Sequence, residues 1–273
     1  ASLIILFGFG GWIKMLFYPE SSRFTEVAVI QPNIDPNKKW DHDNRTSMFN
    51  IMDSLHNEAI QLNPDIILFP ETALPTYLRL NSRIQQKLQQ KVNNSLIPIL
   101  IGTVDKTIDS NGEKKYFNSS MFLSPNSEFI MYEKIHLVPF AEYDLIPDIT
   151  IPLDKLNLNI NRGVFVSGDK FTVFNFDNMM FSNLICYESS FPKYSRNFIK
   201  RGAELLMIQA NDGWLGNSAG PYQHFELARL RAIENRVSVI RSGNTGISGV
   251  IMPTGIVQKK IGLNRQEVFS EKV

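Results

Sequence analysis

The chain of 273 residues contains a single cysteine, and this scarcity excludes two kinds of structure. One thiol cannot build an internal disulfide framework, and it cannot supply a zinc site made of several cysteines. An excess of charge of one sign is also lacking, since 28 basic and 27 acidic residues give a formal net charge of +1. That balance indicates neither a nucleic-acid footprint nor an acidic tail. Internal repeats and low-complexity linkers are absent as well, and the composition is that of a globular protein.

One long apolar run stands at the N-terminus, where residues 1–18 carry a single charge, on Lys14. A full membrane span needs about 20 apolar residues, so the run is slightly short. A signal peptide is disfavoured, because no basic region precedes the run and no A-x-A site follows it. Aromatic residues gather at its end, as they do at a membrane interface: Trp12, Phe17 and Tyr18. We expect residues 1–18 to be the remnant of a transmembrane helix in a piece of a longer chain; the alternative is an apolar segment packed on the domain.

Beyond Pro19, short apolar runs alternate with stretches of helical periodicity. One apolar helical face is predicted from residues at helical spacing: Met48, Ile51, Met52, Leu55, Ala59 and Leu62. Further helices are predicted over 82–92, 193–201 and 221–236, and strands over 27–31, 65–69, 97–104, 116–134 (a pair), 171–176, 180–185 and 205–209. Two last strands, over 237–241 and 247–252, are expected to close a mixed α/β sheet covered by helices.

Three polar residues share one position, directly after an apolar strand. Glu71 follows Ile-Ile-Leu-Phe-Pro, Lys134 follows Phe-Ile-Met-Tyr-Glu, and Cys186 follows Phe-Ser-Asn-Leu-Ile. Sites in open α/β sheets lie just beyond the carboxyl ends of strands, so these side chains are candidates for one crevice. Taken singly, each has an ordinary explanation: a solvated glutamate, a lysine that caps a turn, and a cysteine that packs in the core.

Together the three residues form a coherent chemical set. A thiol attacks well only as a thiolate and therefore needs a base or a cation nearby. Glu71, partly desolvated, is a candidate base with a raised pKa, and Lys134 is a candidate stabiliser of the thiolate and of an oxyanion. The backbone N–H of Tyr187 is a further candidate oxyanion donor. A Cys–His site stays open as an alternative, although the nearest histidine, His224, follows Cys186 only after 38 residues.

The segments around these residues resemble the three catalytic signatures of the nitrilase superfamily: Phe-Pro-Glu-Thr-Ala at 69–73, Tyr-Glu-Lys-Ile-His-Leu-Val-Pro-Phe at 132–140, and Ile-Cys-Tyr-Glu at 185–188. Within that superfamily, the longer segments 70–75, 134–143, 186–192 and 211–246 resemble the apolipoprotein N-acyltransferase family, and the likeness extends from about residue 27 to 257. The resemblance implies an α/β fold, an α-β-β-α sandwich of mixed sheets flanked by helices, with residues 24–273 as the catalytic domain.

The same resemblance assigns roles to particular residues. It makes Glu71 the general base, Lys134 the stabiliser of thiolate and oxyanion, and Cys186 the nucleophile. Glu142 becomes an accessory carboxylate that orients Lys134 and an incoming amine. Three more residues are implied at the substrate site: Tyr187 and Glu188, which support it, and Trp40, which helps to shape an acyl site. The alternatives are an ordinary aromatic residue for Trp40 and simple salt-bridge partners for Glu142 and Glu188.

Two departures from the family pattern concern loops. Ala141 stands where the family usually has glycine, a change that should only stiffen the turn. The usual Asp-Trp-Phe-Gly run appears as Asp-Gly-Trp-Leu-Gly at 212–216, which shifts the aromatic by one position and puts the shape of that loop in doubt. Residues 143–147 and the pair Trp214 and Leu215 are candidates for an apolar lid that meets a bilayer, with core packing as the alternative.

The implied activity is transfer of an acyl chain from a phospholipid, through a thioester on Cys186, to the N-terminal amine of the diacylglyceryl-cysteine of an apolipoprotein. It implies membrane, phospholipid and apolipoprotein partners, no nucleic acid, no metal and no organic cofactor. The implied location is the bacterial inner membrane, with the catalytic domain facing the periplasm. Two rival functions are a soluble nitrilase-type amidase that hydrolyses a small amide, and a non-catalytic binding module with the same fold.

Overall fold

The computed structural model describes residues 24–36, 38–39, 43–139, 141–143 and 165–273. The apolar segment 1–18 and Trp40 therefore lie outside the described residues, as do residues 144–147 of the first candidate lid. Within the described ranges, no helix is both long enough and apolar enough to cross a membrane.

The first sheet has six strands in the spatial order β12-β1-β2-β3-β4-β5. Its strands are β1 (Glu26–Gln31), β2 (Ile66–Leu68), β3 (Ile99–Ile108), β4 (Lys114–Leu123), β5 (Ile130–Glu133) and β12 (Glu267–Lys272). Strands β1, β2 and β3 are parallel, whereas β4 pairs antiparallel with both β3 and β5. Two successive reversals leave β5 running in the same direction as β2, so both strands end at the same edge of the sheet.

The second sheet also has six strands, in the order β11-β10-β9-β8-β7-β6. Its strands are β6 (Val173–Phe176), β7 (Met179–Ile185), β8 (Leu205–Ala210), β9 (Ser238–Gly243), β10 (Ser248–Ile251) and β11 (Val257–Ile261). Strands β7, β8 and β9 form a parallel centre, and antiparallel strands extend it on both sides. Every residue of β8 is buried, as expected for a central strand covered on both faces.

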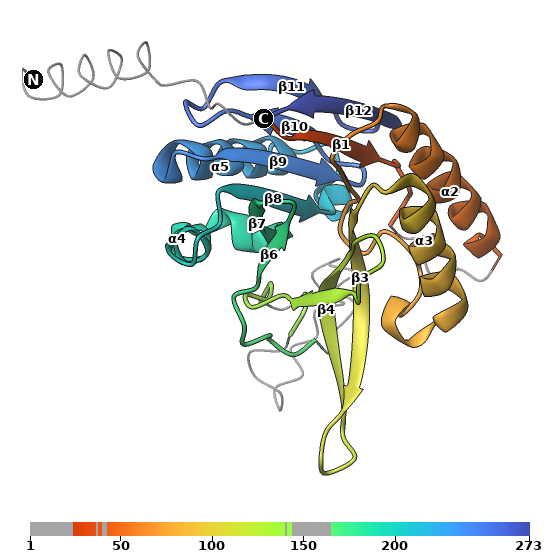
Figure 1. The fold of residues 1–273 in the computed structure, drawn as a ribbon. Coiled ribbons are helices and arrows are strands. Elements are labelled where there is room, and N and C mark those ends of the chain that lie inside the picture. The colour runs from red at the N-terminus through yellow and green to blue at the C-terminus, as the bar shows by residue number, and fades with distance from the viewer. Residues whose placement is uncertain (1–23, 37, 40–42, 140, 144–164) are drawn as a thin grey trace, which may run out of the picture.

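Helices cover the outer face of each sheet (Figure 1). Helices α2 (Arg45–Gln61) and α3 (Ser82–Ser95) lie on the first sheet, and α4 (Pro192–Lys200) and α5 (Gly220–Asn235) lie on the second. One apolar cluster joins α2 and α3 to the first sheet, and a larger one joins both sheets to α4 and α5. The predicted α-β-β-α sandwich of mixed sheets flanked by helices is therefore confirmed.

The prediction that residues 247–252 close the sheet is wrong, because β11 and β12 follow them. Strand β12 pairs antiparallel with β1, and β11 pairs with β10. Both strands stand at a sheet edge, and in β11 the alternate residues Gln258 and Lys260 are exposed. Edge strands with charged outward faces show little apolar periodicity, so the sequence pattern does not reveal them.

Buried polar side chains link the two sheets close to the ends of their parallel strands. The amide of Gln209, on β8, donates to the carbonyl oxygen of Phe69 at 2.7 Å and to that of Leu100 at 3.2 Å. Asn183, on β7, donates to Ser120 of β4 at 2.6 Å and to Gln209 at 2.9 Å. Because a buried polar group is costly unless it is paired, these bonds favour one relative placement of the two sheets.

Candidate active site

The three residues predicted at strand ends do stand at strand ends, but they come from both sheets. Glu71 lies three residues after β2 and Lys134 directly follows β5, at the shared edge of the first sheet. Cys186 directly follows β7 of the second sheet and begins η3, a 3₁₀ helix over Cys186–Ser190. The candidate site therefore lies between the two sheets rather than at the edge of a single one.

A glycine on the neighbouring strand allows the segment of Glu71 to lie where it does. A Cβ atom on Gly102 of β3 would come within 2.4 Å of the carbonyl oxygen of Pro70 and within 2.7 Å of Cα of Glu71. The N–H of Ala73 donates to the carbonyl oxygen of Gly102 at 2.8 Å. Only the absence of a side chain permits so close an approach, so Gly102 helps to set the position of Glu71.

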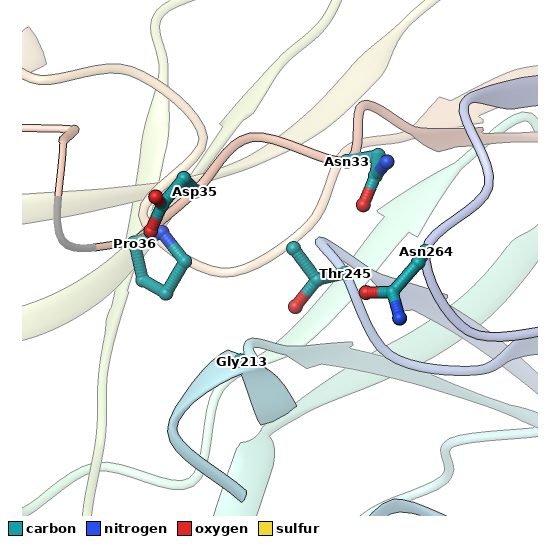
Figure 2. Close-up of a pocket in the computed structure, with 6 residues that line it drawn as sticks. All are labelled: Asn33, Asp35, Pro36, Gly213, Thr245 and Asn264. Carbon is teal, nitrogen blue, oxygen red and sulfur yellow. The ribbon is translucent and has the colours of Figure 1, made fainter. Parts of the chain in front are cut away.

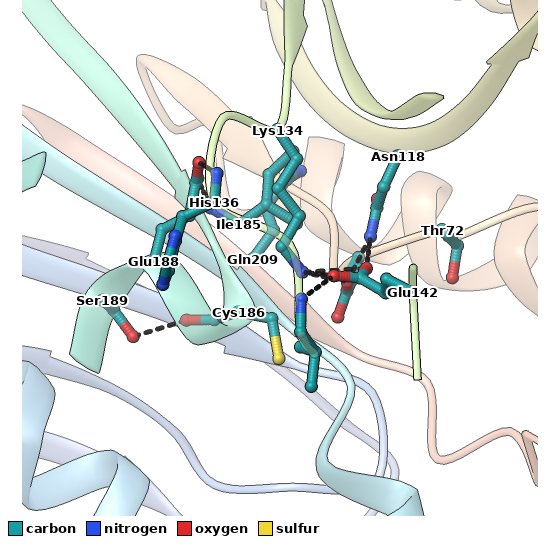
Figure 3. A network of polar contacts seen from close by, with 12 residues as sticks. Thr72, Asn118, Lys134, His136, Glu142, Ile185, Cys186, Glu188, Ser189 and Gln209 are labelled. Atoms are coloured by element: carbon teal, nitrogen blue, oxygen red, sulfur yellow. Dashed lines mark hydrogen bonds and ion pairs between the residues drawn. The ribbon is translucent and has the colours of Figure 1, made fainter. Parts of the chain in front are cut away.

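A buried charged group forms around Lys134 (Figure 3). Its ammonium nitrogen lies 2.8 Å from Oε2 of Glu142 and 3.7 Å from Oε1 of Glu71. Asn118 of β4 donates to both carboxylates, at 2.7 Å to Glu71 and 2.8 Å to Glu142. The backbone N–H of Val138 donates at 2.8 Å to Oε2 of Glu142, the oxygen that also contacts Lys134. The structure thus brings Glu71, Lys134 and Glu142 together, and Asn118 joins the two carboxylates.

Burial and charge act in opposite directions on the ionisable groups of this cluster. Burial raises the pKa of Glu71, and the nearby ammonium of Lys134 only partly offsets that effect. Burial alone would lower the pKa of Lys134, but Glu71 and Glu142 outweigh it and raise the pKa. Oε2 of Glu71 is buried and has no hydrogen-bond partner in the described part of the chain. The cluster therefore combines a permanent cation with a carboxylate oxygen that is free to accept a proton.

The thiol of Cys186 lies within the field of this cluster. Burial raises its pKa well above the ordinary value, Glu71 raises it further, and the opposing effect of Lys134 is too weak to reverse the shift. The thiol is therefore protonated at neutral pH, and Lys134 alone does not produce a thiolate. To act as a nucleophile, Cys186 must lose its proton to a neighbouring base as it attacks.

Glu188 is completely buried and connects the segments that carry Lys134 and Cys186. Its carboxylate accepts from the hydroxyl of Tyr132 at 2.8 Å, from the N–H groups of Ile135 and His136 at 2.7 and 3.1 Å, and from the N–H of Ile185 at 2.7 Å. All four donors are neutral, so these contacts differ from a simple salt bridge. Three of them follow or belong to β5 and one precedes the cysteine, so one side chain links the two sheets beside the site.

The ring of Tyr187 packs in an aromatic group next to the cysteine. It stacks on His136 with ring centroids 5.4 Å apart and meets the edge of Phe191 at 4.9 Å. His136 in turn stacks on Tyr194 at 5.0 Å. Aromatic pairs at these separations are favourable beyond the area that they bury. Tyr187 therefore forms part of a wall beside the site.

Two residues near Glu71 were not predicted from the sequence. Asn118 belongs to a polar triplet in the buried part of β4, and that triplet was its only signal. Lys39 is 3% exposed, and its ammonium lies 3.1 Å from the hydroxyl of Thr72. Burial lowers the pKa of Lys39 to about 8, although the charge of Glu71 acts in the opposite direction. A second buried lysine, Lys39, therefore lies close to the predicted base, Glu71.

A further polar group lies on the other side of Cys186. Cys186, Asp212 and His224 each offer one atom able to bind a metal ion, and these atoms lie within 4.8 Å of one another. Two of the three already have partners: Asp212 lies 2.8 Å from Nδ1 of His224, and its second oxygen lies 2.6 Å from Arg241. A cation would have to displace the ring nitrogen and sit beside a guanidinium, so the arrangement fits a hydrogen-bond chain better than a metal site.

The loop that departs from the family pattern forms η4, a 3₁₀ helix over Asp212–Leu215. Trp214 is 73% exposed and Leu215 is 43% exposed, so the alternative that they are core residues is wrong. Their role as a lid stays a prediction.

A hollow of about 320 Å³ adjoins the same loop at Gly213 (Figure 2). It is lined by Asn33, Asp35, Pro36, Gly213, Thr245 and Asn264. None of the predicted catalytic or binding residues within the described ranges lines it.

The sequence matches the carbon-nitrogen hydrolase family over residues 26–272. It is 32% identical to the apolipoprotein N-acyltransferase of Geobacter metallireducens over 99% of this chain and 51% of that protein, and 34% identical to that of Chlorobaculum tepidum over 84% and 47%. The chain thus spans about half the length of these curated relatives. Its fold is similar to that of an amidase of the nitrilase superfamily from Nesterenkonia, with a TM-score of 0.67 and 18% identity over 93% of this chain and 92% of the other. The family match covers nearly all of the described residues, and this chain belongs to the carbon-nitrogen hydrolase family.

Proposed function

We propose that this chain carries out acyl transfer from a phospholipid, through a thioester on Cys186, to the N-terminal amine of the diacylglyceryl-cysteine of an apolipoprotein. The observation that supports it most is the buried Glu71–Lys134–Glu142 cluster, whose charges act on the thiol of Cys186. Relatives named as apolipoprotein N-acyltransferases, at 32% and 34% identity, favour this reaction over others that such a thiol can perform.

In the first half-reaction, the sulfur of Cys186 attacks the ester carbonyl of the phospholipid while Glu71 takes the thiol proton. The unpartnered Oε2 of Glu71 is the atom suited to receive it. Lys134 and the backbone N–H of Tyr187 stabilise the tetrahedral oxyanion. The carbon–oxygen bond then breaks, Glu71 returns the proton to the departing alkoxide, and a lysophospholipid leaves.

In the second half-reaction, the neutral α-amine of the lipoprotein attacks the thioester carbonyl. Glu71, again ionised, accepts a proton from the attacking nitrogen and delivers it to the sulfur as the carbon–sulfur bond breaks. Glu142 holds Lys134 in place at 2.8 Å and orients the incoming amine. Dividing the transfer into two steps avoids a direct encounter of two bulky lipids, but it requires that water be kept from the thioester.

The remaining predicted residues support this reaction in different ways. Glu188 holds the segments of Lys134 and Cys186 together through its four hydrogen bonds. The stacked ring of Tyr187 lines the site, and Trp40 shapes the space for the acyl chain. No metal or organic cofactor takes part in these steps.

The proposal also includes a membrane location. In this proposal the apolar residues 1–18 contact the bacterial inner membrane, and the catalytic domain of residues 24–273 lies on its periplasmic side. The exposed side chains of Trp214 and Leu215 suit contact with lipid, since aromatic and aliphatic groups favour the membrane interface.

An amidase is the main alternative, because the same thiol and carboxylate can hydrolyse a small amide and the fold resembles that of the Nesterenkonia amidase. A binding module without activity is the second alternative. The presence of all three of Glu71, Lys134 and Cys186 argues against it, since loss of one of them is the usual mark of such a module.

Product analysis tests the proposal. The chain is reconstituted with phospholipid and then supplied with a diacylglyceryl-cysteine peptide or with small amides. Acyl transfer predicts a lysophospholipid and an N-acylated peptide in equal amounts. Release of ammonia from small amides, without any lysophospholipid, would favour the amidase instead. Failure of both reactions would favour the binding module.

A further inference from the structure

The turn that carries Cys186 adopts a conformation that needs support from its surroundings. The φ angle of Cys186 is +50°, in the left-handed region where a residue with a Cβ atom is strained. Its carbonyl oxygen accepts from the hydroxyl of Ser189 at 2.7 Å and lies 3.0 Å from Nε2 of His224. The same ring nitrogen lies 2.9 Å from the Ser189 hydroxyl. Two side chains therefore contact the backbone oxygen of the nucleophile.

His224 is itself held by a series of contacts between buried polar side chains, which ends at β9. Its Nδ1 lies 2.8 Å from Asp212, and Asp212 lies 2.6 Å from the guanidinium of Arg241. Arg241 also donates to the carbonyl oxygen of Ile247 at 3.0 Å. Asp212 and Arg241 are almost completely buried. Burial alone would raise the pKa of Asp212, but Arg241 and His224 lower it to about 2, so the carboxylate remains ionised.

The backbone at Gly246 packs closely against Asp212. A Cβ atom on Gly246 would come within 2.5 Å of Oδ2 of Asp212, the oxygen that contacts Arg241. Asp212 begins η4, His224 lies on α5 and Arg241 lies on β9. The contacts among Arg241, Asp212 and His224 thus connect three separate elements to the carbonyl oxygen of Cys186.

We infer that His224 is a positioning residue, which Asp212 and Arg241 hold in place and which fixes the carbonyl of Cys186 so that the sulfur faces Glu71 and Lys134. The inference rests on the proposed role of Cys186 as nucleophile. Nδ1 of His224 lies 2.8 Å from Asp212 and 3.1 Å from the guanidinium of Arg241. Nε2 already faces Ser189 and the Cys186 carbonyl. Both ring nitrogens are occupied, and the thiol proton goes to Glu71.

The test compares four variants of the 273-residue chain, with two readouts of Cys186. One readout is the rate of alkylation by chloroacetamide, and the other is the rate of acylation by saturating phospholipid. His224→Ala is expected to slow both by about 100-fold, the effect of a nucleophile misplaced by about 1 Å. The phospholipid concentration for half-maximal rate should change less than about threefold. His224→Gln should recover to within about tenfold, because its amide can donate to the same carbonyl.

Two buried serines provide the matched control. Ser189→Ala removes a direct donor to the Cys186 carbonyl and should slow alkylation about tenfold. Ser195→Ala, on α4, removes a donor to Pro192 and an acceptor from Asn235, and should leave the rate unchanged. If His224→Ala does not fold, this pair decides the question in its place.

Alkylation of His224→Ala at the wild-type rate would overturn the inference. The inference would also fail if His224→Gln unfolds at the wild-type temperature but is alkylated as slowly as His224→Ala. Equal slowing of alkylation in Ser189→Ala and Ser195→Ala would contradict it as well. If alkylation depends on His224 as expected but phospholipid never acylates the wild-type chain, the positioning role stands and the proposed acyl transfer fails.

Discussion

On the side of the first sheet, the candidate active site is held together by charge, whereas on the side of the second sheet it is held by backbone contacts. Lys134 lies between the carboxylates of Glu142 and Glu71, at 2.8 and 3.7 Å. Cys186 instead has its carbonyl oxygen bonded to Ser189 at 2.7 Å, and the N–H of the preceding residue bonded to Glu188 at 2.7 Å.

The difference indicates a division of tasks. Buried charges shift proton affinities by amounts that depend steeply on distance, so the first side controls where the thiol proton goes. Hydrogen bonds to the main chain fix direction, so the second side controls where the sulfur points. Glu188 takes donors from both sides and keeps the two in register.

Loss of the base on the charged side should have the largest effect. Glu71→Gln cannot accept the thiol proton, and we expect single-turnover acylation to fall about 1000-fold. Since burial raises the pKa of Glu71, the wild-type rate should increase with pH through that raised value, and the variant should lose this increase. Glu133→Gln, one residue before Lys134, is the matched control and should keep the wild-type profile. A pH-dependent increase that persists in Glu71→Gln would contradict the assignment.

Glu188→Gln removes the connection between the sides and should have the next largest effect. In the wild-type chain, backbone N–H groups donate to the carboxylate of Glu188. In the variant the amide NH2 group faces some of these donors and cannot accept from them. The free energy of unfolding should therefore fall by about 3 kcal/mol. Urea denaturation measures this loss. Tyr132→Phe removes only one donor and should cost about 1 kcal/mol. Equal losses in the two variants would show that Glu188 does not join the sides.

Glu142→Gln tests whether the charged side also needs its second carboxylate. Lys134 would lose its partner at 2.8 Å and shift toward Glu71. A closer ammonium weakens Glu71 as a base, so we expect acylation at saturating phospholipid to slow about 100-fold. The half-saturating concentration should stay nearly constant, because the substrate-binding surface is unchanged. A change in that concentration alone would instead make Glu142 a binding residue.

Acid should lower the stability of the first sheet and its helices through the titration of His56, which lies on α2. His56 packs on Phe69 with ring centroids 5.2 Å apart, and its Nε2 is buried without a partner among the described residues. Burial, aided by Lys91, lowers its pKa from 6.5 to about 4. The unfolded chain therefore binds the proton first as the pH falls below 6.5, and the stability that neutral His56 supplies is lost progressively between pH 6.5 and 4.

From this shift we expect a loss of about 2 kcal/mol between pH 7 and pH 5, measured by urea denaturation. His56→Leu cannot titrate and should flatten this part of the profile. An equally steep loss in His56→Leu would assign the acid sensitivity to other groups.

The parts of this structure that sequence could predict are those that depend on local pattern. Buried strands such as β1 and β8 are runs of apolar residues, and the motif around each of Glu71, Lys134 and Cys186 is contiguous. Strand β12 was missed because its partner lies far along the chain: it pairs with β1, more than 200 residues away. Strand β11 pairs with its neighbour β10 and was missed because its exposed polar residues hide any apolar periodicity.

Distance along the chain also explains the contacts in the site that the sequence did not reveal. His224 follows Cys186 by 38 residues, and Arg241 lies 29 residues after Asp212. Nothing in those spacings shows that a helix, a 3₁₀ turn and a strand converge on one carbonyl oxygen. Asn118 likewise reaches Glu71 across 47 residues. Contacts of this kind depend on how the two sheets pack against each other. Local sequence patterns do not reveal that packing.

The most direct test of the thioester is peptide mass spectrometry of the chain after brief exposure to a phospholipid with one defined acyl chain. The mechanism predicts a mass gain of one acyl group on the peptide that contains Cys186, and no such gain in Cys186→Ala. Wild-type chain that yields lysophospholipid without any acylated Cys186 peptide, or an equal gain in Cys186→Ala, would contradict it.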